Sequence, residues 1–168
     1  MRRTVAMIGG VALAVVLSQF PEYAQQYTQR LGGAVDELRI VTEDFDRAAV
    51  SGGLSRAQAL ERYNASNDDF LAGRGTSMTA TFQRFEQLSN TLAEVQGAGP
   101  YERFQSLPFY FDTDIGRRTL ESFKPAVPVT LEGFAYAGAG FVLGYLVLSA
   151  LWRLCALPFK RRRYAYKY

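Results

Sequence analysis

Apolar residues fill two stretches near the ends of the chain, at residues 4–20 and 133–152. At about 1.5 Å per residue, the second stretch forms a helix of about 30 Å, which matches the hydrocarbon core of a membrane. The first stretch has 17 residues, which is near the lower limit for a spanning helix. The pattern therefore predicts two membrane-spanning helices.

The first stretch also resembles a secretory signal peptide, because Arg2 and Arg3 precede its apolar centre. Cleavage requires small residues at the third-last and last positions before the cut, and Val16-Leu17-Ser18 is a mediocre match. We expect a retained anchor. Cleavage after Ser18 is the alternative, and the mature chain would then begin at Gln19.

Between the two stretches, apolar positions recur every three or four residues in two long segments, at residues 23–48 and 70–95. Breakers rich in glycine follow each segment, at residues 51–53 and 97–100. Ser55 and Gln58 have the spacing of a capping box and predict a short helix that ends near Tyr63. No segment sustains the alternation of period two that strands require. The predicted fold class is all-α.

Each long segment carries one apolar stripe that must be buried, and an antiparallel pair with the short helix at its far turn achieves this. The predicted molecule is a helical hairpin, or stalk, flanked by two transmembrane helices. The alternative is that a partner helix docks into an exposed stripe. The expected organisation is a basic flank and first span at 1–20, an exported helical domain at 21–127, the second span at 128–153 and a basic, aromatic tail at 154–168.

Charge predicts how the chain is oriented. Eight of the 19 basic residues lie at the two ends, whereas residues 21–127 hold eleven basic and fifteen acidic residues, a net charge of −4. Loops on the cytoplasmic side of a membrane are enriched in Lys and Arg close to the spans. We therefore expect both termini in the cytoplasm and an exported helical domain between the spans.

Composition excludes several kinds of chemistry. The chain has no histidine and a single cysteine, Cys155. An intramolecular disulfide, a His- or Cys-based metal centre and a Ser-His-Asp triad are therefore excluded. We expect no catalytic, cofactor-binding or metal-binding residues, and no enzyme activity.

Small residues line one face of each predicted span. Such strips allow two helices to approach closely where lipid supplies no hydrophobic drive. The strips can pack on each other within one chain or against another subunit, and both interpretations stay open. Their members are Ala6, Gly10 and Ala14 in the first span and Gly133, Ala137, Gly140 and Gly144 in the second.

Glu132 is an acidic residue at the boundary of the second span. A carboxylate deep in a membrane indicates an ion or proton site, whereas one at the interface suits the positive end of a helix. The interfacial interpretation is our expectation and the functional carboxylate is the alternative. Asp68 and Asp69, at a helix start in the exported domain, are expected to be capping residues.

Two further segments indicate contact with lipid. Lys160, Arg161, Arg162 and Arg163 directly follow the second span, where a basic cluster binds an anionic leaflet at about 1 kcal/mol per residue. Nucleic acid is not an expected partner, because nothing beyond charge supports it. Five aromatic residues precede the second span and belong either to the membrane interface or to the lower core of the stalk. They are Tyr101, Phe104, Phe109, Tyr110 and Phe111.

The chain resembles a known family. Residues 31–38 (LGGAVDEL), 97–100 (GAGP) and 124–133 (KPAVPVTLEG) carry the likeness. It resembles small bacterial inner-membrane proteins classed only as a domain of unknown function. The resemblance implies two spans around a helical exported domain and transfers no activity, although it places Glu132 inside a motif. Together with the charge pattern, it leads us to expect a protein of the bacterial inner membrane with cytoplasmic termini and a periplasmic central domain.

The functional expectation is a non-catalytic accessory or scaffold subunit that contacts a larger membrane complex, through a membrane-protein partner or as a homo-oligomer. The alternative is an enzyme or transporter component that uses Glu132 or the exported acidic residues.

Overall fold

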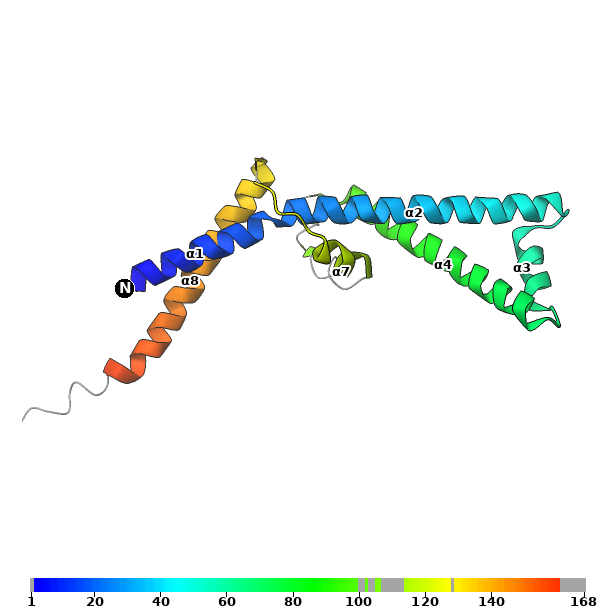
Figure 1. Ribbon diagram of the computed structural model, residues 1–168. Coiled ribbons are helices and arrows are strands. Elements are labelled where there is room, and N and C mark those ends of the chain that lie inside the picture. Colours follow the sequence, from blue (N-terminus) through cyan, green and yellow to red (C-terminus); the bar gives the residue numbers. More distant parts are fainter. Residues whose placement is uncertain (1, 100–101, 103–104, 107–113, 128, 161–168) are drawn as a thin grey trace, which may run out of the picture. The chain divides into compact units, whose positions relative to one another are not determined.

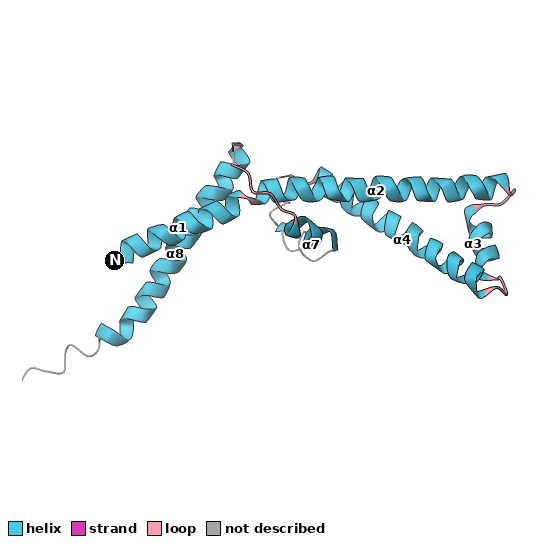
Figure 2. Cartoon of the chain, viewed as in Figure 1, coloured by secondary structure: helices cyan, strands magenta, loops and turns pink. Residues whose placement is uncertain are grey.

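The computed structural model describes residues 2–99, 102, 105–106, 114–127 and 129–160, with side chains as far as Cys155. Every regular element in these ranges is an α-helix (Figures 1 and 2). The predicted all-α class is therefore confirmed. The helices are α1 (Arg2–Ser18), α2 (Phe20–Ser51), α3 (Arg56–Asn64), α4 (Asp69–Gly97), α7 (Asp114–Glu121) and α8 (Leu131–Lys160).

The chain divides into two compact units. Unit 1 consists of Met1–Gln25 together with Ser122–Tyr168, and unit 2 consists of Gln26–Glu121. Unit 1 holds α1, the first turn of α2 and α8, and α1 packs on α8. Unit 2 holds the rest of α2 with α3, α4 and α7.

Two helical stretches are long and apolar enough to cross a membrane, one within Arg2–Ser51 and the other within Leu131–Cys155. The second stretch begins two residues before the uncharged run at 133–152, and its helix continues past Trp152 to Lys160. Thr130 caps this helix, because its Oγ1 accepts a hydrogen bond of 3.1 Å from the backbone N of Gly133.

The helix breaks at Gln19, between α1 and α2. Pro21 lies in the first turn of α2, where its missing N–H interrupts the hydrogen-bond ladder at little cost. Two backbone hydrogen bonds span the junction of the helices. Gln19 N donates to Val16 O at 3.2 Å, and Tyr23 N donates to Gln19 O at 3.0 Å. The second helix, α2, thus begins one residue before Pro21.

Capping residues set the boundaries of the helices in unit 2. The backbone N of Ser55 donates to Gln58 Oε1 at 2.9 Å, and Gln58 N donates back to Ser55 Oγ at 3.3 Å. This capping box confirms the predicted start of α3. Asp68 Oδ1 accepts from Phe70 N at 2.8 Å and so caps α4. Gly53, with φ of 71°, makes the left-handed turn after α2.

In unit 2, α2 and α4 run in opposite directions but do not pack along their whole length. Figure 1 shows them separating toward α3, which bridges the open end. There α3 packs on α4, while α2 meets α4 through Phe45 and Phe82, whose ring centroids are 5.5 Å apart. The two helices are thus antiparallel, as the apolar stripes predict, but they are not in contact along their whole length. The apolar stripe of α4 beyond Met78 is therefore only half-buried.

The core of unit 2 includes Leu31 and Val35 of α2 and Thr119 of α7, which are the largest side chains with under 2% exposure. Leu31 and Val35 belong to the predicted apolar stripe. Thr119 is polar, and its hydroxyl donates 2.7 Å to the carbonyl oxygen of Ile115 one turn earlier. The predicted aromatic cluster between residues 101 and 111 lies outside the described residues.

Candidate functional site

The structure brings the small residues of α1 and α8 face to face. A Cβ atom added at Gly140 would lie 2.6 Å from the carbonyl oxygen of Leu13, and one at Gly144 would lie 2.5 Å from that of Gly9. The two backbones therefore approach as closely as glycine allows. Ala6, Gly10, Gly133, Gly140 and Gly144 are buried, and Ala14 and Ala137 are half-buried.

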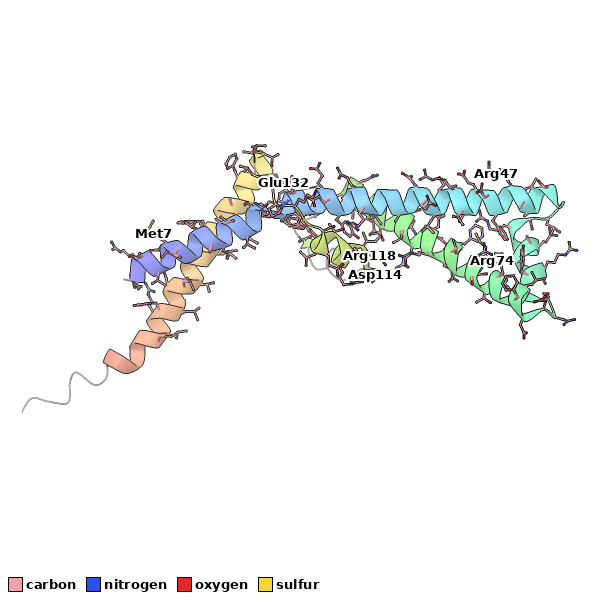
Figure 3. All side chains as sticks on the ribbon, viewed as in Figure 1. Met7, Arg47, Arg74, Asp114, Arg118 and Glu132 are labelled. Atoms are coloured by element: carbon pink, nitrogen blue, oxygen red, sulfur yellow. The ribbon has the colours of Figure 1, made fainter. Side chains whose placement is uncertain are left out.

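The outer faces of the same two helices carry large apolar side chains that nothing in unit 1 covers. On α1, Met7 is 54% exposed and Ile8 is 65% exposed, and Figure 3 shows Met7 on the outer side of the helix. On α8, Leu146 and Leu154 are 57% and 62% exposed. Helices buried in the core of a soluble protein do not leave such side chains in water.

Glu132 lies in the first turn of α8 (Figure 3). The residue is half-buried, and its Oε1 atom is shielded from solvent. A carboxylate in this position interacts favourably with the positive end of the helix dipole. The geometry suits the expected helix-start role.

Two pairs of aromatic rings lie in the same unit as Glu132. The rings of Phe20 and Tyr136 are 5.3 Å apart, and those of Tyr23 and Phe123 are 5.8 Å apart. Gln19 links the N-terminal and C-terminal segments of unit 1, because its Oε1 accepts a hydrogen bond of 3.1 Å from the backbone N of Ala126. Sequence reasoning did not single out these ring pairs, since their members lie about 100 residues apart in the chain.

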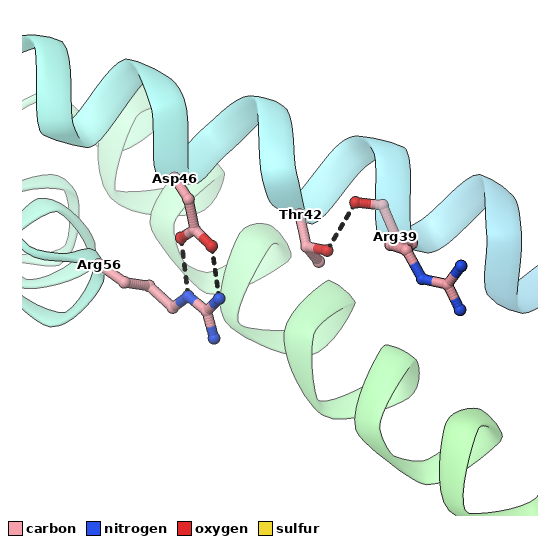
Figure 4. A network of polar contacts seen from close by, with 4 residues as sticks. All are labelled: Arg39, Thr42, Asp46 and Arg56. Atoms are coloured by element: carbon pink, nitrogen blue, oxygen red, sulfur yellow. Dashed lines mark hydrogen bonds and ion pairs between the residues drawn. The ribbon is translucent and has the colours of Figure 1, made fainter. Parts of the chain in front are cut away.

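Unit 2 contains a polar junction of three helices, shown in part in Figure 4. Arg56, at the start of α3, donates two hydrogen bonds to Asp46 of α2, one of them from Nε to Oδ1 at 2.8 Å. The same guanidinium stacks over the ring of Phe82 on α4, with 4.2 Å between Cζ and the ring centroid. Hydrogen bonding by Arg56 lowers the pKa of Asp46, with a smaller opposing effect of burial.

Gly75 of α4 allows α3 to pack closely. A Cβ atom there would lie 2.8 Å from the Cβ of Tyr63 and would overlap the side-chain oxygen of Asn64. In the sequence, Gly73-Arg74-Gly75 is visible only as an interruption of the apolar periodicity of this helix. Gly73 has no neighbour within 4 Å of such an atom, so only Gly75 has a packing role, and periodicity does not distinguish the two.

A hollow of about 480 Å³ lies among the end of α2, α3 and the start of α4. Its lining is mainly apolar and includes Phe45, Leu54, Ala59, Tyr63 and Leu71, with the cation of Arg62 also present. This volume falls within the range of small-molecule and side-chain pockets. We call this end of unit 2 the tip.

The remaining predicted residues lie as follows. Asp68 serves as the N-cap of α4, and Asp69 occupies its first turn. Cys155 is exposed. Lys160 is the last residue of α8, whereas Arg161, Arg162 and Arg163 lie outside the described residues.

The fold defines a class: an all-α protein with two helices able to cross a membrane and a separate helical unit between them in sequence. The chain belongs to the family described as protein of unknown function DUF2937, whose model matches residues 1–161. This confirms the expected membership of a family without assigned function. No curated protein and no solved structure matches the chain.

Proposed function

We propose that this chain is an integral membrane protein whose helical unit 2 lies outside the cytoplasm, where it serves as a non-catalytic accessory or scaffold subunit of a larger membrane complex. The observation that carries the membrane assignment is the exposure of the apolar helices. Only 22% of the most apolar window near the N-terminus and 17% of that in α8 is buried. Lipid is the environment in which the remaining apolar surface is stable.

The orientation rests on charge. Arg2, Arg3 and the basic residues from Arg153 onward flank the two apolar helices, while the segment between them is net negative. An excess of Lys and Arg marks the cytoplasmic side. Both termini are then cytoplasmic and unit 2 is periplasmic, in the inner membrane of a bacterium.

Cysteine labelling tests this orientation. In a Cys155→Ser background, Ala57→Cys places a thiol on exposed α3 and Tyr168→Cys places one at the carboxyl end. A membrane-impermeant maleimide added to intact spheroplasts should label position 57 and should label position 168 only after lysis. The reverse pattern would overturn the orientation, and labelling of both in intact spheroplasts would overturn cytoplasmic termini.

The packing of the small-residue strips restricts where a partner protein can bind. Because Gly140 and Gly144 pack on α1 of the same chain, a partner protein would contact the outer faces of the two helices or unit 2. Purification of the full chain in a mild detergent, followed by mass spectrometry of co-purifying proteins, tests the scaffold role. A reproducible stoichiometric partner is the expected result. The scaffold role would be contradicted if the chain is cross-linked in the cell, purified from the membranes and still found without any partner.

A second candidate function uses Glu132. Its shielded Oε1 atom at the edge of a span is the observation that favours an ion or proton site. The isosteric variant Glu132→Gln removes the charge and keeps the shape. Unchanged growth and membrane potential in this variant would exclude the ion site, whereas loss of either with normal protein levels would favour it.

A further inference from the structure

The tip of unit 2 exposes large apolar side chains beside the hollow. Phe70 is 80% exposed and Val50 is 72% exposed, while Leu71 and Tyr63 at the hollow are 40% and 36% exposed. Contiguous exposed apolar surface next to a concave site is a mark of a protein interface. A small ligand in the hollow would leave Phe70 in water, so the surface suits a macromolecular partner.

The backbone of Phe70 is fixed at the start of α4. Its backbone N donates to the capping carboxylate of Asp68 at 2.8 Å, and it directly precedes Leu71, which lines the hollow. The ring therefore projects from a fixed helix start. An aromatic side chain has only two rotatable χ angles and therefore loses little conformational entropy when it is buried in a partner.

The tip also carries charges of both signs without ion-pair partners among the described residues. The ion pairs near the tip are Asp44 with Arg47 and Asp46 with Arg56. They leave Arg62, which lines the hollow, and Asp69, which precedes Phe70. The tip thus offers a projecting ring, a hollow that can accept a ring, a cation and an anion.

A two-fold symmetric interface requires complementary features within the same region of each copy, because that region contacts itself. We infer that two copies of the chain associate through their tips. Phe70 of each copy enters the hollow of the other, and Arg62 faces Asp69 of the partner subunit. This interface does not depend on the accessory role, because it needs no other protein.

Sedimentation of the full chain in a density-matched detergent tests the inference. The wild type should form a concentration-dependent dimer, and Phe70→Ala should raise its dissociation constant at least about tenfold, as expected for a central aromatic anchor. Ile40→Ala is the matched control, because Ile40 is 54% exposed on α2 away from the hollow. It should leave the dissociation constant unchanged.

Charge reversal tests the symmetric pairing. Arg62→Asp and Asp69→Arg should each weaken the dimer, and the double variant should restore it, provided that circular dichroism shows normal helix content. A monomeric wild type would overturn the inference, and so would a dimer that is indifferent to Phe70→Ala. Native mass spectrometry that finds a small molecule or another protein on a monomeric chain would also overturn it. Failure of the dimer would leave the proposed scaffold role standing, since that role is tested by co-purification.

Discussion

The guanidinium of Arg56 lies over the ring of Phe82, with 4.2 Å between its Cζ atom and the ring centroid. The same group pairs with Asp46, so one side chain of α3 contacts both long helices of unit 2. Because α2 and α4 separate toward this end, Arg56 replaces part of the direct packing that the two helices lack. The junction is therefore a structural element.

Replacement of Arg56 should destabilise unit 2. An exposed ion pair contributes about 0.2–1 kcal/mol and a cation–π contact about 0.5–1 kcal/mol. Arg56→Ala should thus lower the free energy of unfolding by about 1–2 kcal/mol, measured by urea titration of the detergent-solubilised chain with circular dichroism. Arg74→Ala, which removes an exposed cation of α4, is the control and should cost under about 0.5 kcal/mol. Equal effects of the two substitutions would contradict the role of the junction.

Stability should fall in acid through the same junction. Hydrogen bonding by Arg56 holds the pKa of folded Asp46 below its ordinary value of 3.8. A group with a depressed folded pKa stabilises the fold above its unfolded pKa, and this stability is lost as pH falls through the folded pKa. The difference in unfolding free energy between wild type and Asp46→Asn should therefore be largest above about pH 4 and shrink below it. A difference that stays constant from neutral pH to pH 2 would argue against the ion pair.

Two glycines of α4 should respond oppositely to alanine. Gly75→Ala places a methyl group against Tyr63 and Asn64 and should destabilise unit 2 by about 1–3 kcal/mol, the usual cost of overpacking. Gly73→Ala meets no neighbour and should stabilise the helix by about 0.5–1 kcal/mol. Thermal melts by circular dichroism of both variants check the pair. Similar shifts of both melting temperatures would show that α3 does not pack on Gly75.

The contact between α1 and α8 can be probed in the same way. Gly144→Leu would drive a side chain into the backbone of Gly9 and Gly10, whereas Gly138 has open space around it. Gly144→Leu should separate the two helices, and Gly138→Leu should be tolerated. The measurement is disulfide cross-linking between Ala6→Cys and Leu148→Cys in a Cys155→Ser background. Gly144→Leu should reduce this cross-linking at least about tenfold, since backbone atoms cannot move aside, and Gly138→Leu should not reduce it. Equal cross-linking in both variants would show that the small residues of α8 do not pack on α1.

Local signals in the sequence sufficed for the existence of the helices and for several of the helix ends in unit 2. The capping box at Ser55, the cap at Asp68 and the breaker at Gly52-Gly53 act over a few residues, so they can be read directly from the chain. The two apolar stretches follow from composition and length alone. The small residues of the strips were also identifiable, because spacings of three and four define one helical face.

Other features depend on residues far apart in the chain. Spacing could not show whether the strips pack on each other or on another subunit, and in the structure Gly140 and Gly144 lie against α1 of the same chain. Periodicity could not show that α2 and α4 separate, because a stripe indicates which face is buried but does not identify its partner.

The sequence by itself determined the all-helical class, the capped starts of α3 and α4, the two apolar helices and the asymmetry of charge. Only the tertiary structure placed Arg56 between Asp46 and Phe82, distinguished Gly75 from Gly73 and formed the hollow beside Phe70. The physical reason is range: helix propensity, capping and hydrophobic periodicity act within a few turns of chain, whereas a contact between helices depends on three-dimensional packing that no local pattern encodes.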